Sequence, residues 1–357
     1  MNGDITDQND MIHWGGFYEV INGANQLLKS APQVVQRDPS FSSSDLEEVQ
    51  AEAYFLRAMS YFYLVRAFKE VPLITEPYTT DEQDYYPAKS EEQEVLDQIV
   101  RDLTKSLDLA AQSYDTEVAN RGRANTYAVS ALLADVYLWR SNYDQAIEQC
   151  NHVINSGEYG LLGASNWFKN FYPGNSNSSI FEIQFDQNWN ARSGLYETFS
   201  YNKRREYQVN PRSLELFDAA DIRGEGATWN EENFEVWKYV GTNPDEERGD
   251  ALNDNNFIVY RLADVKLMKA EALAEKKQFD QAQAIINEIR SRRGVSEVSL
   301  DPTVTSFEDY ILDERARELA FEGKRWFDIL RMGKRNDYER KELVINALIM
   351  NAPAELI

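Results

Sequence analysis

The chain has 357 residues, of which 43% are hydrophobic and 27% are charged, so it carries enough apolar material for a large folded core. Its formal net charge of -23 gives an anionic surface that repels nucleic-acid phosphates, so we expect no nucleic-acid partner. No run of about 18 apolar residues marks a transmembrane helix, and the single cysteine, Cys150, excludes an intramolecular disulfide.

Apolar residues recur at helical spacing through the first part of the chain. Ser44 followed by Glu47, and Ser90 followed by Gln93, each give a capping-box signature, in which a side-chain hydroxyl and a later polar side chain satisfy the first amides of a helix. The helix that starts at Ser44 is apolar on most of its circumference, which indicates burial between neighbours. The predicted helices cover residues 11–30, 44–70, 90–109, 124–140 and 143–156.

The character changes between residues 157 and 256. Glycine, asparagine and serine are interspersed among aromatic residues, which is typical of a loop-rich insert. Short alternating runs predict strands at 180–186 and 235–240, and residues 211–220 have helical spacing.

Helical periodicity returns at 262–275, at 279–292 with Gly294 as the expected C-cap, and at 307–331 before Gly333. Residues 131–154 align with residues 267–290, because both combine small residues in one helix with an aromatic-Asp-Gln-Ala turn into the next. This spacing lets two helices approach closely and is similar to tetratricopeptide packing. We therefore expect a mainly α fold built from helical hairpins.

Side chains for common catalytic chemistry are sparse. The two histidines, His13 and His152, stand in neither HxxxH nor HExxH spacing, so a zinc hydrolase or a serine-histidine-aspartate triad has little material. With 60 acidic residues, a glycosidase-type carboxylate pair stays open, because such a pair is defined by its separation in space. Oxygen donors that could hold Ca²⁺ lack the EF-hand register, so we predict a solvated loop and no cofactor at Asp250, Asn253, Asp254, Asn255 and Asn256.

Three stretches carry a family resemblance. The sequences AEAYFLRAMSYFYLVRAFKEVPLIT at 51–75, FIVYRLADVKLMKAEALAE at 257–275 and DERARELAFEGKRWFDILRMGK at 313–334 resemble, in this order, the SusD/RagB outer-membrane lipoproteins. The resemblance implies a tetratricopeptide-like scaffold that docks on a SusC-type TonB-dependent transporter and captures a glycan or other nutrient on irregular loops. It implies one domain over 1–357, divided into an N-terminal helical scaffold (10–156), the loop-rich insert (157–256), a C-terminal helical hairpin and motif (257–335) and a tail (336–357).

The resemblance also implies that the chain is a fragment. The family carries a signal peptide, a lipidated cysteine and a long segment before the equivalent of Trp14, whereas this chain begins shortly before it. The closing residues NAPAELI match the family's C-terminal tail only loosely. The implied location is the outward face of the outer membrane, with attachment through a lipid anchor that this sequence does not include.

The candidate binding surface follows from sugar chemistry. A sugar presents apolar C–H faces and a rim of hydroxyls, so it needs exposed aromatic rings beside groups that donate and accept hydrogen bonds. The segment 187–204 combines these most densely, and Trp229, Trp237 and Tyr239 form a weaker group; the alternative is that Trp189 and Tyr201 fold back to seal the insert. The candidate ligand-binding residues are Asn188, Trp189, Asn190, Arg192, Tyr196, Tyr201, Arg204 and Trp229.

Other aromatic and charged residues are expected to serve packing. Trp167 and Phe168, like Trp326 and Phe327, are predicted to lie in the core. Charged residues at intervals of three and four in the last helix predict ion pairs within that helix, among Arg315, Arg317, Glu318, Glu322 and Arg325.

The resulting hypothesis is binding without turnover: the chain holds an oligosaccharide and delivers it to the transporter. Two alternatives stay open. A tetratricopeptide-like scaffold that grips a protein or peptide would explain the helices but leave the aromatic insert without a role. A glycoside hydrolase would use two carboxylates of the insert.

Overall fold

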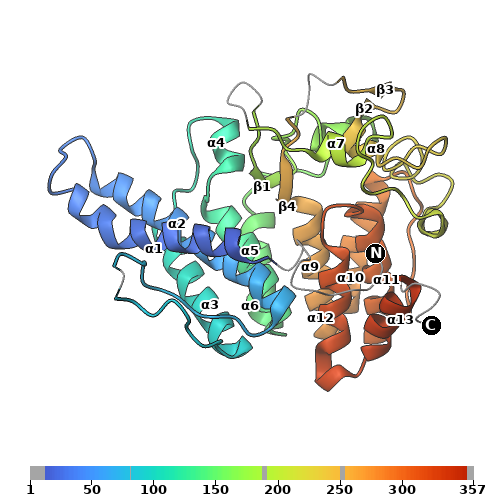
Figure 1. Ribbon diagram of the computed structural model, residues 1–357. Helices are drawn as coiled ribbons and strands as arrows, with labels where there is room; N and C mark the ends of the chain where they lie inside the picture. Colours follow the sequence, from blue (N-terminus) through green and yellow to red (C-terminus); the bar gives the residue numbers. More distant parts are fainter. Residues whose placement is uncertain (1–12, 81, 187–190, 250–253, 352–357) are drawn as a thin grey trace. The chain divides into compact units, whose positions relative to one another are not determined.

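The computed structural model describes residues 13–80, 82–186, 191–249 and 254–351, and it confirms a mainly helical fold with a few short strands (Figure 1). The chain forms two compact units, each discontinuous in sequence. Unit 1 comprises residues 1–114, 123–136 and 333–357, and unit 2 comprises residues 115–122 and 137–332. The single domain expected over 1–357 stays a prediction.

Unit 1 contains α1 (Gly15–Val34), α2 (Ser43–Phe68) and α3 (Glu92–Leu109), and α2 packs against both of the others. In Figure 1 these helices are drawn in blue and cyan, with α1 and α2 side by side. α2 is buried along most of its length, as its apolar circumference predicted. A buried ion pair joins two of these helices, because Arg57 on α2 donates to both carboxylate oxygens of Asp102 on α3 at 2.6 and 2.8 Å.

Both predicted capping boxes are wrong in detail. The cap of α2 is Ser42, whose hydroxyl accepts from the Asp45 amide at 3.1 Å while the Asp45 carboxylate accepts from the Ser42 amide at 2.8 Å. The box therefore lies two residues before Ser44. α3 follows Glu91 and has no side-chain cap, so Ser90 does not serve as one.

Two further helices of the N-terminal half, α5 (Thr126–Trp139) and α6 (Tyr143–Ile154), lie close to their predicted bounds. The short helix α4 (Glu117–Gly122) was not predicted. Cys150 on α6 is buried, as expected for a small apolar residue.

In unit 2, α9 (Leu262–Glu275) packs against α6, α10 (Phe279–Arg292) and α11 (Val304–Glu318). The predicted bounds of α9 and α10 are confirmed, and the two helices form the predicted hairpin. Gly294 has φ +74°, the left-handed conformation that commonly follows a helix end.

The single helix predicted over 307–331 is wrong. α11 ends at Glu318, and a new helix, α12 (Arg325–Tyr338), begins after a turn in which Phe321 has φ +62° and Gly323 has φ +72°. Gly333 does not end α12. The backbone of α12 departs from helical geometry only at Arg335. The last helix, α13 (Lys341–Asn351), follows α12. Apolar periodicity continues across the turn, so the pattern alone hides the break.

The insert contains two small antiparallel sheets. β1 (Ser179–Ile183) pairs with β4 (Phe257–Arg261), and β2 (Gly241–Asn243) pairs with β3 (Glu246–Glu247). The strand predicted over 235–240 is wrong, because Trp237–Val240 forms the short helix α8. Three further short helical segments complete the insert: the 3-10 helices η2 (Ala164–Asn170) and η4 (Pro211–Leu216), and α7 (Leu195–Phe199).

The insert has its own hydrophobic core, which includes Trp167, Phe171, Trp229 and Tyr239. Trp167 is buried and Phe168 packs against this cluster half-buried, so their predicted packing role is confirmed. No helix in the described part of the chain is both long enough and apolar enough to span a membrane.

Candidate functional site

The predicted binding residues of the insert do not share one environment. Asn188, Trp189 and Asn190 lie outside the described residues. Arg192 is exposed. Arg204 is also exposed, and its guanidinium group lies 2.9 Å from a carboxylate oxygen of Glu197 and 3.4 Å from one of Glu206.

Tyr196 is buried, contrary to the expectation that it presents its ring to a sugar. It lies on α7, is 4% exposed, and packs against Trp237 and Val240 of α8. Its hydroxyl donates to a carboxylate oxygen of Glu247 at 2.8 Å. The ring is therefore used to hold α7 against α8.

Trp229 is also buried, at 4% exposure, so it is not the exposed platform expected from the sequence. Its ring meets Phe217 edge to face, with 4.6 Å between ring centroids. Trp237 and Tyr239, the other members of the weaker predicted group, are buried as well. All three rings are therefore largely covered by neighbouring side chains.

Tyr201 remains an open aromatic surface, because its side chain is 49% exposed. The Arg205 guanidinium carbon lies 4.5 Å from the centre of the Tyr201 ring, and the Tyr201 amide donates to Glu235 at 2.8 Å, which fixes the backbone. Tyr207 is similarly exposed and leans on Phe199. We call residues 201–207 the tyrosine–arginine segment, since it combines open rings with guanidinium donors.

A second aromatic surface, in unit 1, was not predicted. It is a groove of about 390 Å³ beside α1, which we call the α1 groove, and the side chains of Pro72 and Asn22 contribute to its lining. Tyr86 is 93% exposed. The aromatic residues that line the α1 groove are Trp14, Tyr18, Tyr78, Tyr85 and Tyr86.

Hydrogen bonds to the backbone fix three of the rings in the α1 groove. The Tyr18 hydroxyl donates to the Pro72 carbonyl at 2.7 Å, and those of Tyr78 and Tyr85 donate to carbonyls of their own segment at 2.9 and 3.2 Å. Tyr78 and Tyr85 stack with 5.1 Å between centroids and 14° between ring planes. The rings are therefore pre-oriented, which lowers the entropy cost of binding a ligand.

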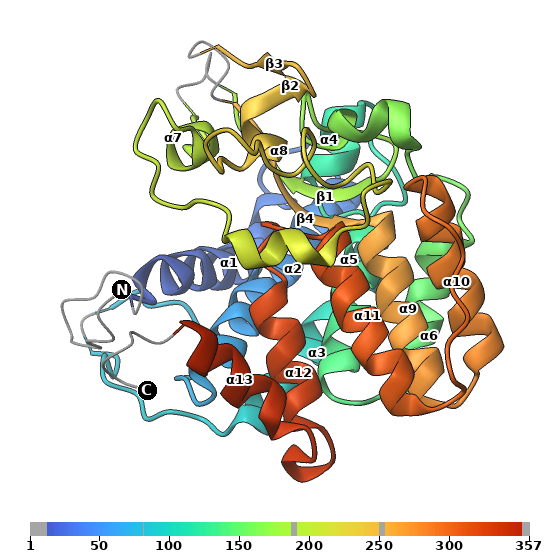
Figure 2. The same ribbon diagram turned by 90° about the vertical axis from the view of Figure 1, so that its right-hand side faces the viewer.

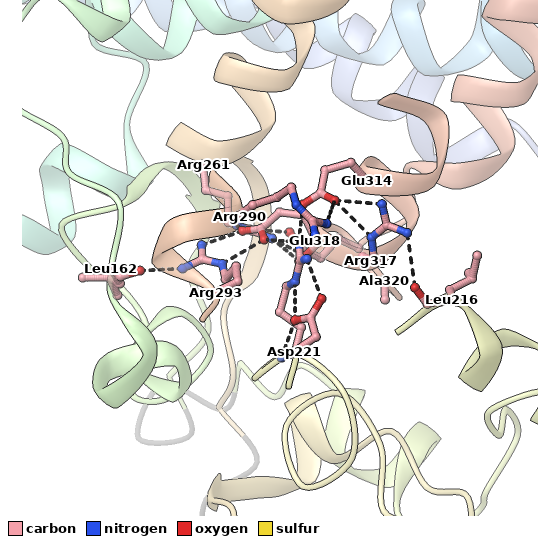
Figure 3. A network of polar contacts seen from close by, with 12 residues as sticks. Leu162, Leu216, Asp221, Arg261, Arg290, Arg293, Glu314, Arg317, Glu318 and Ala320 are labelled. Atoms are coloured by element: carbon pink, nitrogen blue, oxygen red, sulfur yellow. Dashed lines mark hydrogen bonds and ion pairs between the residues drawn. The ribbon is translucent and has the colours of Figure 1, made fainter. Parts of the chain in front are cut away.

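The charges of the C-terminal motif lie in a buried cluster rather than on one helix face. Glu318 accepts hydrogen bonds from Arg293, Arg261 and Arg223, which belong to three other segments of unit 2. Figure 3 shows the Glu318 carboxylate among the guanidinium groups of Arg261 and Arg293. We call this the arginine–glutamate cluster, and its members are Asp221, Arg223, Lys238, Arg261, Arg293, Glu314, Glu318 and Glu322.

The predicted ion pairs within one helix are therefore mostly wrong. Arg317 does pair with Glu314 one turn away, at 2.8 Å. Arg315 instead reaches Asp264 on α9 and Asp328 on α12, both at 2.8 Å. Trp326 is a further correction, because it is 42% exposed instead of belonging to the core, and Phe327 is half-buried.

The cluster shifts the pKa values of its members. Burial by itself raises the pKa of Glu318, but Arg293 and Arg261 outweigh it and hold that pKa well below its ordinary range. Burial lowers the pKa of Lys238 to about 8, although its ion pair with Glu322 at 2.9 Å opposes the shift. These buried carboxylates are committed to cations, which indicates a structural role.

The oxygen donors considered for Ca²⁺ are partly engaged in loop packing. The Asn255 side chain donates to the Tyr239 carbonyl at 3.3 Å, and Asn256 donates to Glu182 at 2.7 Å. Asp250 and Asn253 lie outside the described residues, and within those described no group of three or more histidine, cysteine or acidic side chains is arranged to hold a metal ion.

The fold and these surfaces define a helical-hairpin protein with aromatic surfaces on its loops and beside its first helix. Residues 141–355 match the model of the SusD family, and residues 2–138 match a family described as starch-binding associating with outer membrane. The chain therefore belongs to the SusD family, as its three motifs indicated.

Relatives and solved structures agree. A SusD-like protein, P38 of Formosa agariphila, is 27% identical over 94% of this chain and 75% of its own length. A crystal structure of a SusD superfamily protein from Bacteroides thetaiotaomicron is 24% identical, with a TM-score of 0.81 over 96% of this chain and 81% of that one. A structure described as a laminarin binding SusD-like protein is 25% identical, with a TM-score of 0.72 over 93% of this chain and 79% of that one.

Proposed function

We propose that this chain binds oligosaccharides at the outer face of the outer membrane and delivers them to a SusC-type TonB-dependent transporter without cleaving them. Membership of the SusD family supports the proposal. So does the similarity to a protein described as laminarin binding. The match of residues 2–138 to a starch-binding family that associates with the outer membrane supports the location.

The observation that carries the proposal is the α1 groove. Its stacked Tyr78 and Tyr85 rings and exposed Tyr86 offer apolar faces to the C–H surface of a pyranose ring, and its volume of about 390 Å³ lies within the range of small-ligand sites. Because three of the hydroxyls are bound to the backbone, the ring faces are the part that a ligand meets.

The tyrosine–arginine segment is the second proposed contact surface. Tyr201 supplies a ring face, and Arg204 supplies guanidinium donors for sugar hydroxyls, together with Arg192 earlier in the loop. Asn188, Trp189 and Asn190 remain proposed contacts on the sequence argument. Tyr196 and Trp229 would act by supporting the fold of the insert, because both are enclosed.

Purified protein titrated calorimetrically with a panel of oligosaccharides, including β-glucan and starch fragments, tests the binding. Stacking and a few hydrogen bonds, opposed by hydroxyl desolvation, predict a dissociation constant on the order of micromolar to millimolar. Incubation of the same oligosaccharides with the protein should release no shorter product. Binding to no glycan would contradict the proposal, and steady product release would show that the chain is an enzyme.

Delivery needs a separate test. The protein should co-purify with a SusC-type transporter when the two are expressed together, and glycan should not abolish the complex. Failure to associate would leave glycan binding intact but would contradict the transport half of the proposal.

A further inference from the structure

Unit 2 contains a cleft of about 440 Å³ that the proposed glycan surfaces do not include. One side is formed by η4 and the residue that follows it, Phe217, and the other by α11 and the turn into α12. Figure 2 shows η4 in yellow beside α11, and Arg317 of α11 donates to the Leu216 carbonyl at the end of η4 at 3.2 Å. Four aromatic side chains line the cleft: Phe217, Trp229, Phe321 and Trp326.

The turn between α11 and α12 places the first residues of α12 at this cleft. Phe321 and Gly323 both adopt positive φ, and the residues that follow, Lys324, Arg325 and Trp326, all line it. A positive φ at a bulky residue such as Phe321 costs energy that the surrounding structure must offset. Trp326 is 42% exposed at a position where the amphipathic pattern predicts burial. Its exposed ring is therefore available to cover a ligand.

Two polar groups in the cleft wall lack partners. The Trp229 indole nitrogen and the Thr228 hydroxyl oxygen are buried and have no hydrogen-bond partner among the described residues. Their residues are only 4% and 1% exposed, so bulk water does not satisfy them. Neither atom is open to the cleft, so this wall presents ring and methyl surface and offers a ligand no hydrogen bond from these two groups.

The charge of the cleft is opposite to that of the chain. Among the described residues that line it there are two cations, Lys324 and Arg325, and no acidic side chain, although the chain carries a net charge of -23. Lys324 is held by Asp264 at 2.9 Å and by the Val259 carbonyl at 2.7 Å. Arg325 is more exposed: its guanidinium group donates to the Leu312 carbonyl and lies 3.7 Å from a carboxylate oxygen of Asp313, and its side chain stays 43% exposed. Arg325 is therefore the cation that an anionic ligand can reach.

From these observations we infer that the cleft binds a small aromatic carboxylate, with its ring between the aromatic walls and its carboxylate at Arg325. A pyranose would fit poorly, because mainly apolar walls leave most of its hydroxyls without partners. An aromatic carboxylate needs few polar contacts, and the Arg325 guanidinium group is suited to it. The site is independent of the proposed glycan function.

Calorimetric titration of the whole chain with 4-hydroxycinnamate tests this inference, with the uncharged 4-hydroxycinnamamide as its matched probe. We expect the carboxylate to bind about tenfold or more tightly than the amide, because a charge-assisted hydrogen bond is lost with the amide. Arg325→Gln should remove most of this preference, and Trp326→Ala should weaken both probes about tenfold. The exposed Arg101→Gln, on α3, is the control and should change neither.

Both test positions are exposed, so the variants should fold, and circular dichroism checks this. Equal affinity for acid and amide would overturn the charge argument. No binding of the carboxylate at millimolar concentration, or displacement of it by a neutral oligosaccharide from the Trp326 site, would overturn the inference. Glycan affinity should be unchanged in Arg325→Gln, which separates this result from any failure of the proposed function.

Discussion

Glu318 on α11 accepts two hydrogen bonds from the guanidinium group of Arg293 at the end of α10, at 2.6 and 2.9 Å. Both side chains are almost fully buried, and Glu318 also accepts from Arg261 and Arg223. One carboxylate thus joins the C-terminal helices to β4 and to the loop around Arg223. We expect it to determine how the insert is fixed to its scaffold.

Glu318→Gln should destabilise the protein by about 3 kcal/mol or more, because it leaves buried arginines without their counter-charge. Urea unfolding followed by circular dichroism measures the change in the free energy of unfolding. Glu288→Gln is the control, since Glu288 pairs with Lys266 at the surface and should cost less than about 1 kcal/mol. Equal effects of the two variants would contradict the role assigned to Glu318.

Acid should weaken the native protein through the same group. The pKa of Glu318 is lowered in the folded state, so the folded chain stays unprotonated where the unfolded chain, with a pKa of about 4.3, begins to take up a proton. The stability that Glu318 contributes is complete above that unfolded pKa and is lost as the pH falls below it. Unfolding measured between pH 6 and pH 3 should therefore show a steeper loss for the wild type than for Glu318→Gln. Parallel curves would contradict this assignment.

Lys238 should give a pH dependence of the same sign as that of Glu318, but in the alkaline range. Its folded pKa is about 8, whereas an unfolded lysine titrates near about 10.4. Between these values the unfolded chain binds more protons, so the contribution of Lys238 to the free energy of unfolding rises with pH. The difference in stability between the wild type and Lys238→Met should accordingly shift in favour of the wild type from pH 7.5 to pH 10. A shift in the other direction would show that burial does not lower this pKa.

The cap of α2 allows a test with a closely matched control. Ser42→Ala should cost about 1 kcal/mol, because it removes the hydroxyl that accepts from the Asp45 amide. Ser44→Ala, two residues further on and inside the helix, should be neutral or slightly stabilising, because alanine has a higher helix propensity than serine. The thermal unfolding midpoints of the two variants show which serine caps the helix. A larger fall in midpoint for Ser44→Ala than for Ser42→Ala would support the cap position predicted from the sequence.

Much of the scaffold could be predicted from the sequence because its signals are local. α9 and α10 have apolar periodicity, a short turn and Gly294 beyond the second helix, and their predicted bounds are confirmed. The break between α11 and α12 could not be predicted, because apolar periodicity continues across it. The arginine–glutamate cluster could not be predicted either, since the partners of Glu318 lie far along the chain. In sequence, Arg293 lies 25 residues from Glu318, Arg261 lies 57 residues away, and Arg223 lies 95 residues away.

The candidate site shows the same limit. A loop that displays Tyr201 and Arg204 was predictable from composition. The burial of Tyr196 was not, because it depends on Glu247, 51 residues away. The α1 groove was missed because its rings come from α1 and from a segment after α2; three tyrosines within residues 78–86 were the available signal.

The glycan proposal makes a specific claim about aromatic surfaces. Tyr86→Ala should weaken oligosaccharide binding about tenfold, because an exposed ring that stacks on a sugar contributes on the order of 1 kcal/mol or more. Tyr201→Ala should have a similar or smaller effect. Tyr338→Ala removes an exposed tyrosine outside both surfaces and should leave the affinity unchanged.

The most direct measurement is a calorimetric titration of the wild type and the Tyr86→Ala/Tyr201→Ala double variant with the best-binding oligosaccharide. The account predicts a saturable heat for the wild type and a loss of at least tenfold in affinity for the double variant, with the thermal midpoint unchanged. Undiminished binding by a folded double variant would contradict the claim that these aromatic surfaces hold the glycan.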